Sequence, residues 1–126
     1  MSTPNINFTP EQITALFIDA AREGDTDLLT QFLDAGMTPD AADSRGYTAL
    51  IVATYNGHIE AARLLLDRGA NPEATDLKGA TALSGVAVKG LQDIAALLIE
   101  KGANVDHANH PGRTPLTFAI MFGRAD

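Results

Sequence analysis

Histidines and acidic residues are the side chains with which this chain could do chemistry. His107 and His110 are three positions apart, and Asp106 adjoins the first of them. These are metal-ligand types, but a metal site needs three or four converging ligands, and the chain contains no cysteine. Two histidines and one acid in a turn-forming segment are explained as well by solvated loop residues. We therefore expect no metal site and no bound cofactor.

Sequence motifs for catalysis are missing as well. No glycine-rich loop ends in Lys-Ser or Lys-Thr to cradle a phosphate, and no Gly-x-Ser-x-Gly elbow carries a serine nucleophile. The 16 acidic residues fall mostly in expected turns or on solvated helix faces. A tuned acid–base pair among them would be an accident. We therefore predict that the protein is not an enzyme.

The chain repeats itself with a constant 33-residue step. Pentapeptides that begin at positions 46, 79 and 112 read Gly-Tyr-Thr-Ala-Leu, Gly-Ala-Thr-Ala-Leu and Gly-Arg-Thr-Pro-Leu. Such a period is typical of stacked repeat proteins, in which each unit buries its apolar face against its neighbours. A stack of this kind offers a long surface to another macromolecule rather than a deep catalytic pocket.

Each repeat predicts two short helices and a loop. In residues 43–75, Thr48 is expected to cap the first helix and Gly57 to end it. Apolar residues at helical spacing predict a second helix over 59–66, which ends before Gly69. Neither helix can bury its apolar face alone, so neighbouring units must supply the rest of the core.

The first unit and the linking segments follow from the same signals. Residues 9–12 read Thr-Pro-Glu-Gln and predict a capping box, with helices over 10–23 and 26–34. Pro39 and Pro72 would break a helix, so we expect extended backbone there.

His58 is expected at the start of a second helix. Asp25, Leu91 and Arg124 stand at the equivalent positions of the other units. Because the residue type varies so widely, we interpret this position as structural rather than as a ligand site.

The unit resembles an ankyrin repeat, in which a turn, two helices and a β-hairpin finger recur with the same period. The motifs that carry the resemblance are the pentapeptides at 46–50, 79–83 and 112–116, Asn56-Gly57-His58, Leu64-Leu65-Leu66, Gly69-Ala70-Asn71 and Gly102-Ala103-Asn104. The resemblance implies an all-α solenoid of about four helix-turn-helix units with β-hairpin-like finger loops. It places the whole chain, 1–126, in one domain with units at 10–42, 43–75, 76–108 and an incomplete 109–126.

Two departures from the family pattern bear on stability. The histidine that follows the leucine of the motif in the family is absent, and Ile51, Ser84 and Thr117 stand there. Hydrogen bonds that this histidine makes between units in the family are therefore in doubt here, and a softer stack is expected. The proline of the motif occurs only as Pro115.

The charge is uneven along the chain. Residues 1–43 carry eight acidic residues against the single base Arg22, whereas the remaining chain has eight of each, and the formal net charge is −7. Nucleic-acid binders usually present a basic face, so we expect no nucleic-acid partner. The sequence has no apolar run of about 18 residues, so no membrane span is expected. The lack of cysteine and of a secretory leader suggests a cytoplasmic location.

In ankyrin-type stacks, the resemblance implies that partners meet the concave face, made of the finger tips and the ends of the first helices. The positions that fall there carry aromatic, aliphatic and basic side chains of the kinds enriched at protein interfaces. They are Arg45, Tyr47, Leu77, Lys78, His110 and Arg113 from the fingers, and Tyr55, Val88, Lys89, Met121 and Phe122 from the helix ends. We predict an apolar surface with basic fingers that suits an acidic or mixed-charge protein.

The function predicted is therefore a non-catalytic protein–protein interaction module. One alternative is a regulatory or inhibitory subunit that masks a partner enzyme. Another is a structural protein that associates with itself, because the 33-residue step places the second helix of the fourth unit near 125–134, beyond Asp126. Either this sequence belongs to a longer chain, or Leu116, Ala119 and Ile120 form an open edge that packs on another copy or on a partner.

Overall fold

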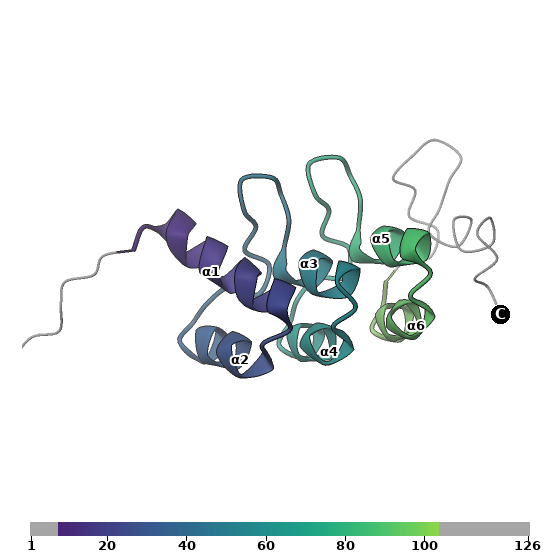
Figure 1. Ribbon diagram of the computed structural model, residues 1–126, viewed down its shortest axis with the longest axis horizontal. Coiled ribbons are helices and arrows are strands. Elements are labelled where there is room, and N and C mark those ends of the chain that lie inside the picture. Colours follow the sequence, from purple (N-terminus) through teal and green to yellow (C-terminus); the bar gives the residue numbers. More distant parts are fainter. Residues whose placement is uncertain (1–7, 104–126) are drawn as a thin grey trace, which may run out of the picture.

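The computed structural model describes residues 8–103, which form three helix pairs stacked side by side (Figure 1). The first pair is α1 (Pro10–Glu23) and α2 (Thr26–Asp34), and the second is α3 (Ala49–Tyr55) and α4 (Ile59–Asp67). The third is α5 (Ala82–Lys89) and α6 (Gln92–Glu100). This all-α repeat solenoid is the fold class that the 33-residue period predicts.

The helices begin where the sequence predicts. Thr9 Oγ1 accepts a hydrogen bond from the Gln12 backbone N–H at 3.1 Å, and the Gln12 side chain accepts one from the Thr9 backbone N–H at 2.9 Å. This reciprocal pair is the expected capping box, with Pro10 at the first helical position. Thr48 caps α3 through its hydroxyl oxygen alone, and Thr81 caps α5 with a second capping box, in which Ser84 is the partner.

The prediction of extended backbone at the two prolines is wrong. Pro39 and Pro72 each lie in a turn. The backbone N–H two residues after the proline donates to the carbonyl of the residue before it, at 3.1 Å for Ala41 and 3.2 Å for Ala74. Proline suits this turn because its fixed φ matches the second turn position. The chain therefore bends sharply at each of these prolines.

The inner row of helices is α1, α3 and α5, and the outer row is α2, α4 and α6. Each helix contacts the next one in its own row and the other helix of its own pair. The loops 35–48 and 68–81, which we call the fingers, rise above the inner row (Figure 1). An antiparallel bridge joins Ala42 and Thr48 across the first finger.

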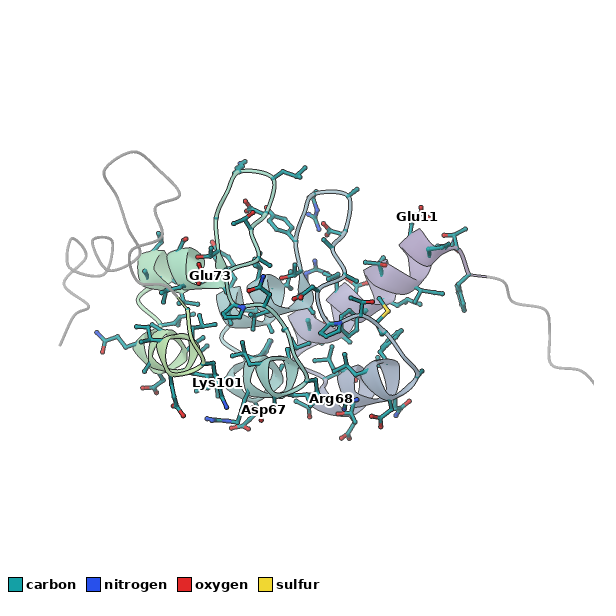
Figure 2. All side chains as sticks on the ribbon, turned by 180° about the vertical axis from the view of Figure 1, so that it is seen from behind. Glu11, Asp67, Arg68, Glu73 and Lys101 are labelled. Atoms are coloured by element: carbon teal, nitrogen blue, oxygen red, sulfur yellow. The ribbon has the colours of Figure 1, made fainter. Side chains whose placement is uncertain are left out.

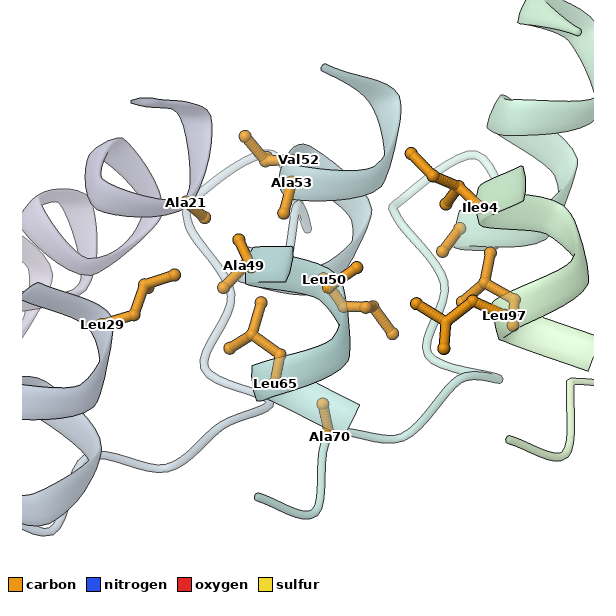
Figure 3. Packing of buried hydrophobic residues seen from close by; sticks show 14 of the residues in the cluster. Ala21, Leu29, Ala49, Leu50, Val52, Ala53, Leu65, Ala70, Ile94 and Leu97 are labelled. Atoms are coloured by element: carbon orange, nitrogen blue, oxygen red, sulfur yellow. The ribbon is translucent and has the colours of Figure 1, made fainter. Parts of the chain in front are cut away.

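The core runs without interruption through all three pairs (Figure 3). Ala21, Ala49 and Ala53 of the inner helices have no exposed surface, and such small side chains let neighbouring helices approach closely. The first pair is closed by the Phe17 and Phe32 rings, which meet edge to face with centroids 5.6 Å apart. Burial against neighbours, rather than propensity, therefore stabilises helices as short as seven residues.

Polar side chains also join the units. Arg68 donates to Asp34 at 2.8 Å, and Lys101 donates to Asp67 at 2.9 Å, one unit further on (Figure 2). Each base follows the acid of the preceding unit by 34 positions. Exposed pairs of this kind contribute about 0–1 kcal/mol each, so they set register more than stability.

Of the residues that replace the family histidine, Ile51 and Ser84 form no side-chain hydrogen bond between units within residues 8–103. Ile51 packs against the core, and Ser84 hydrogen-bonds to Thr81 within its own unit. Thr117 lies outside the described residues. Other side chains join the inner row instead, among them His58 and Lys89.

Candidate partner-binding face

The fingers and the ends of the inner helices carry the predicted partner-binding residues. Within the described part these are Arg45, Tyr47, Leu77 and Lys78 from the finger tips, with Tyr55, Val88 and Lys89 from α3 and α5, and we call this set the binding face. Four further predicted residues, His110, Arg113, Met121 and Phe122, lie outside the described residues.

Asp43 builds the first finger tip. Its Oδ1 accepts hydrogen bonds from the backbone N–H of Arg45 at 2.9 Å and of Tyr47 at 3.1 Å. Its Oδ2 accepts from the Arg45 guanidinium at 3.0 Å. The guanidinium carbon lies 4.9 Å from the centre of the Tyr47 ring, so the arginine also covers the tyrosine. Tyr47 is half-buried, because its ring also packs against the hydrophobic core.

The same contacts tune the carboxyl group of Asp43. Partial burial acts to raise its pKa, but the hydrogen bonds from the Arg45 guanidinium and from the two backbone N–H groups outweigh burial. The pKa therefore lies below its ordinary value of 3.8. A group whose pKa is lowered on folding stabilises the fold above its unfolded pKa, and this stabilisation is lost as the pH falls through the folded value.

We expect Asp43→Asn to lower the free energy of unfolding by about 1 kcal/mol near pH 7, because the pair with Arg45 is lost. The difference between the variant and the wild type should shrink as the pH falls below 3.8. Urea unfolding at a series of pH values measures the loss near pH 7 and its decrease at low pH. A difference that stays constant down to strongly acidic pH would contradict the role of the carboxylate charge.

The second finger tip repeats this construction. Asp76 Oδ1 accepts from the backbone N–H groups of Lys78 at 2.8 Å and Ala80 at 3.0 Å. Leu77 at the tip is 78% exposed. The two fingers touch there, because a Cβ built on Gly46 would lie 2.8 Å from the Leu77 backbone nitrogen. The Lys78 side chain forms no ion pair within residues 8–103.

Tyr55 and Lys89 form the helical half of the binding face. The Lys89 ammonium donates to the Tyr55 carbonyl at 2.8 Å and lies 4.3 Å from the centre of its ring. The ring itself rests on Gly85, where a Cβ would lie 3.3 Å from Tyr55 Cδ1. Tyr55 and Val88 nevertheless stay 49% and 46% exposed. The structure thus holds a partly exposed aromatic ring in a fixed position between two units.

His58 has a role that the sequence did not reveal. Its Nε2–H donates to the Arg22 carbonyl at 2.8 Å, and its ring lies against Gly24, so it ties the second unit to the end of α1. The interpretation of the position as structural is consistent with this contact. The variety of its equivalents hid the tie, because Leu91 cannot make the same hydrogen bond.

Other kinds of site find little support in residues 8–103. No three His, Cys, Asp or Glu side chains of this part come together in a way that could hold a metal ion. None of its helices combines the length and apolar character needed to cross a membrane. His107 and His110 lie beyond this part of the chain.

Comparison with known proteins agrees with the architecture. A family model described as ankyrin repeats (3 copies) matches residues 2–76, more than half of the chain, and one described as ankyrin repeats (many copies) matches residues 86–126. An ankyrin repeat protein of Pseudomonas aeruginosa is 35% identical over 61 residues, 48% of this chain and 36% of that protein. An ankyrin repeat-containing protein of Schizosaccharomyces pombe is 40% identical over 45 residues, 36% of this chain and 22% of that protein.

The matched segments thus cover well under half of the length of either relative. The family assignment rests on the model that matches more than half of this chain, on the 33-residue period, and on the stacked helix pairs. The chain belongs to the ankyrin repeat family.

Proposed function

We propose that this protein binds another protein through its binding face. Ankyrin repeats generally mediate protein–protein interactions, and within this chain the face combines exposed apolar side chains with basic ones. The observation that carries the proposal is the exposure of Leu77, Tyr55 and Val88, at 78%, 49% and 46%, beside Lys78 and Lys89. Aromatic and aliphatic anchors next to cations suit a partner surface that is apolar with acidic or mixed charge.

The face is also held in place before any partner arrives. The Asp43 and Asp76 turns fix both finger tips, and Lys89 and Gly85 hold the Tyr55 ring from two sides. A surface with fixed side chains loses little conformational entropy on binding, which favours affinity. We further propose that the chain acts as a single domain, 1–126, in the cytoplasm.

The test combines partner capture with a matched variant. Affinity capture from the source cell supplies the partner, and calorimetric titration of the purified pair gives the dissociation constant. We expect Tyr55→Ala with Leu77→Ala to weaken binding at least tenfold, because each removes an exposed anchor of more than about 1 kcal/mol. The melting temperature should change little, since Tyr55 is 49% and Leu77 is 78% exposed.

Ile99→Ala is the control. Ile99 is 45% exposed on outer helix α6, away from the fingers, and should leave affinity unchanged. If the Tyr55 and Leu77 double variant keeps its fold and binds the partner as the wild type does, the partner does not bind at the binding face.

A further inference from the structure

The first helix pair exposes apolar residues at positions that the later pairs bury. Ala49 and Ala61 of the second pair are 0% and 1% exposed. Their equivalents one repeat earlier are Leu16 and Leu28, which are 44% and 37% exposed. Helices α3 and α4 are covered by the preceding pair, since α1 contacts α3 and α2 contacts α4. Within residues 8–103, no helix pair covers α1 and α2 in that way.

The same end of the stack departs from the repeat in another respect. Helix α1 has 14 residues, whereas α3 has seven and α5 has eight. Its first six residues, 10–15, stand one repeat before 43–48, the last part of the first finger, and add Ile13, 36% exposed and three positions before Leu16. Phe8, 51% exposed, precedes the helix. We call Phe8, Ile13, Leu16 and Leu28 the end face.

The sizes of these side chains argue against another repeat as the occupant. Where one pair packs on the next, the equivalent positions hold Ala49, Ala61 and Ala82, and only Ile94 is large. Leucines at both positions of the first pair leave less room for a helix pair seated at the same distance. The end face is therefore not suited to a further helix pair of the same repeat, which leaves a single helix as a possible occupant.

The negative charge around the end face limits which occupants can bind there. Residues 10–34 contain six acidic residues and one base, Arg22, which pairs with Asp19. Glu11, Glu23 and Asp27 form no ion pair within the described residues, and Glu11 stands in the first turn of α1 (Figure 2). A second copy of this chain would bring the same negative charge to the contact, which opposes pairing of two end faces.

We propose that the end face binds a basic amphipathic helix of a partner protein. The surface is built by two helices, and helices cover the equivalent surface in each later unit, so a helical occupant suits its shape. The apolar stripe of such a helix covers Ile13, Leu16 and Leu28. Its lysine and arginine side chains lie beside the acidic residues around this stripe. Apolar contact alone would not distinguish a basic helix from an acidic one, whereas these charges do.

Two labelled peptides of about 18 residues serve as probes, both with leucines at helical spacing, one with lysine and one with glutamate at the remaining positions. Fluorescence anisotropy with the full chain should give at least tenfold tighter binding for the lysine peptide. Leu16→Gln with Leu28→Gln should weaken that binding at least tenfold. Leu77→Gln on the binding face is the matched control and should leave it unchanged, whatever becomes of the proposed partner-binding function.

Several results would overturn the proposal. The first is that the lysine peptide binds the wild type and the Leu16, Leu28 variant with equal affinity. The second is that the lysine and glutamate peptides bind the wild type with equal affinity. A dimer in sedimentation equilibrium that dissociates in the same variant would assign the end face to a second copy. Binding that strengthens at least tenfold after removal of residues 1–7 would assign it to the chain's own first segment.

Discussion

Leu65→Ala is expected to lower the free energy of unfolding by about 2–5 kcal/mol, the usual cost of removing a fully buried leucine from a packed core. Leu65 has no exposed surface and lies in α4, the middle helix of the outer row, which contacts both α2 and α6 (Figure 3). The cavity would therefore weaken the middle pair and its contacts on both sides. Because a repeat stack is stabilised by contacts between neighbouring units, damage in the centre should affect the whole described part.

Urea unfolding followed by far-UV circular dichroism measures this loss. Leu77→Ala is the matched control, since it removes the same atoms from a side chain that is 78% exposed. It should change the free energy of unfolding by no more than about 0.5 kcal/mol. Similar losses in both variants would mean that burial in the stack does not determine stability as described.

Gly24→Ala is expected to lower the free energy of unfolding by about 1.5–3.5 kcal/mol, the sum of a backbone cost and a lost hydrogen bond. Gly24 ends α1 with a φ of +71°, a conformation that costs other residues about 1–2 kcal/mol. A Cβ at this position would lie 2.6 Å from His58 Nδ1. The imidazole must then move and give up its hydrogen bond to the Arg22 carbonyl, which adds about 0.5–1.5 kcal/mol.

Gly57 offers the matched comparison, because it stands one repeat later with a φ of +80°. No described atom lies within 4 Å of a Cβ built there, so Gly57→Ala should show the backbone cost alone. Adding His58→Ala to Gly24→Ala removes the clash, and the double variant should lose less than the sum of the two single losses. Thermal unfolding of the wild type, Gly24→Ala, His58→Ala and the double variant tests this. If the losses of the two single variants add up to that of the double variant, the contact between Gly24 and His58 is not the cause.

Local signals in the sequence predicted the elements well. Thr9, Thr48 and Gly24 mark helix ends through bonds to residues three or four positions away, and such bonds depend only on the neighbouring sequence. The 33-residue period then predicted the stacking, because neither helix of a pair can bury its apolar side alone. The proline turns were misjudged, since proline is equally compatible with extended backbone and with the second position of a turn.

Contacts between units were harder to predict. The tie from His58 to the Arg22 carbonyl joins residues 36 positions apart, and the Tyr55 ring rests on Gly85 of the next unit. Nothing near either residue in the sequence specifies its partner. The exposed leucines of the end face have the same apolar type as core leucines, so only the packed structure separates Leu16 and Leu28 from Leu65.

The ion pairs along the outer row give the stack a direction. Asp34 of the first unit pairs with Arg68 of the second, and Asp67 of the second pairs with Lys101 of the third. Glu100 occupies the next acidic position in the sequence. Duplication or loss of the complete second unit, 43–75, would leave these acid–base pairs between neighbouring units matched. A duplication that breaks within this unit would separate the acid from the base, so insertion or loss of the whole unit is the change that these pairs favour.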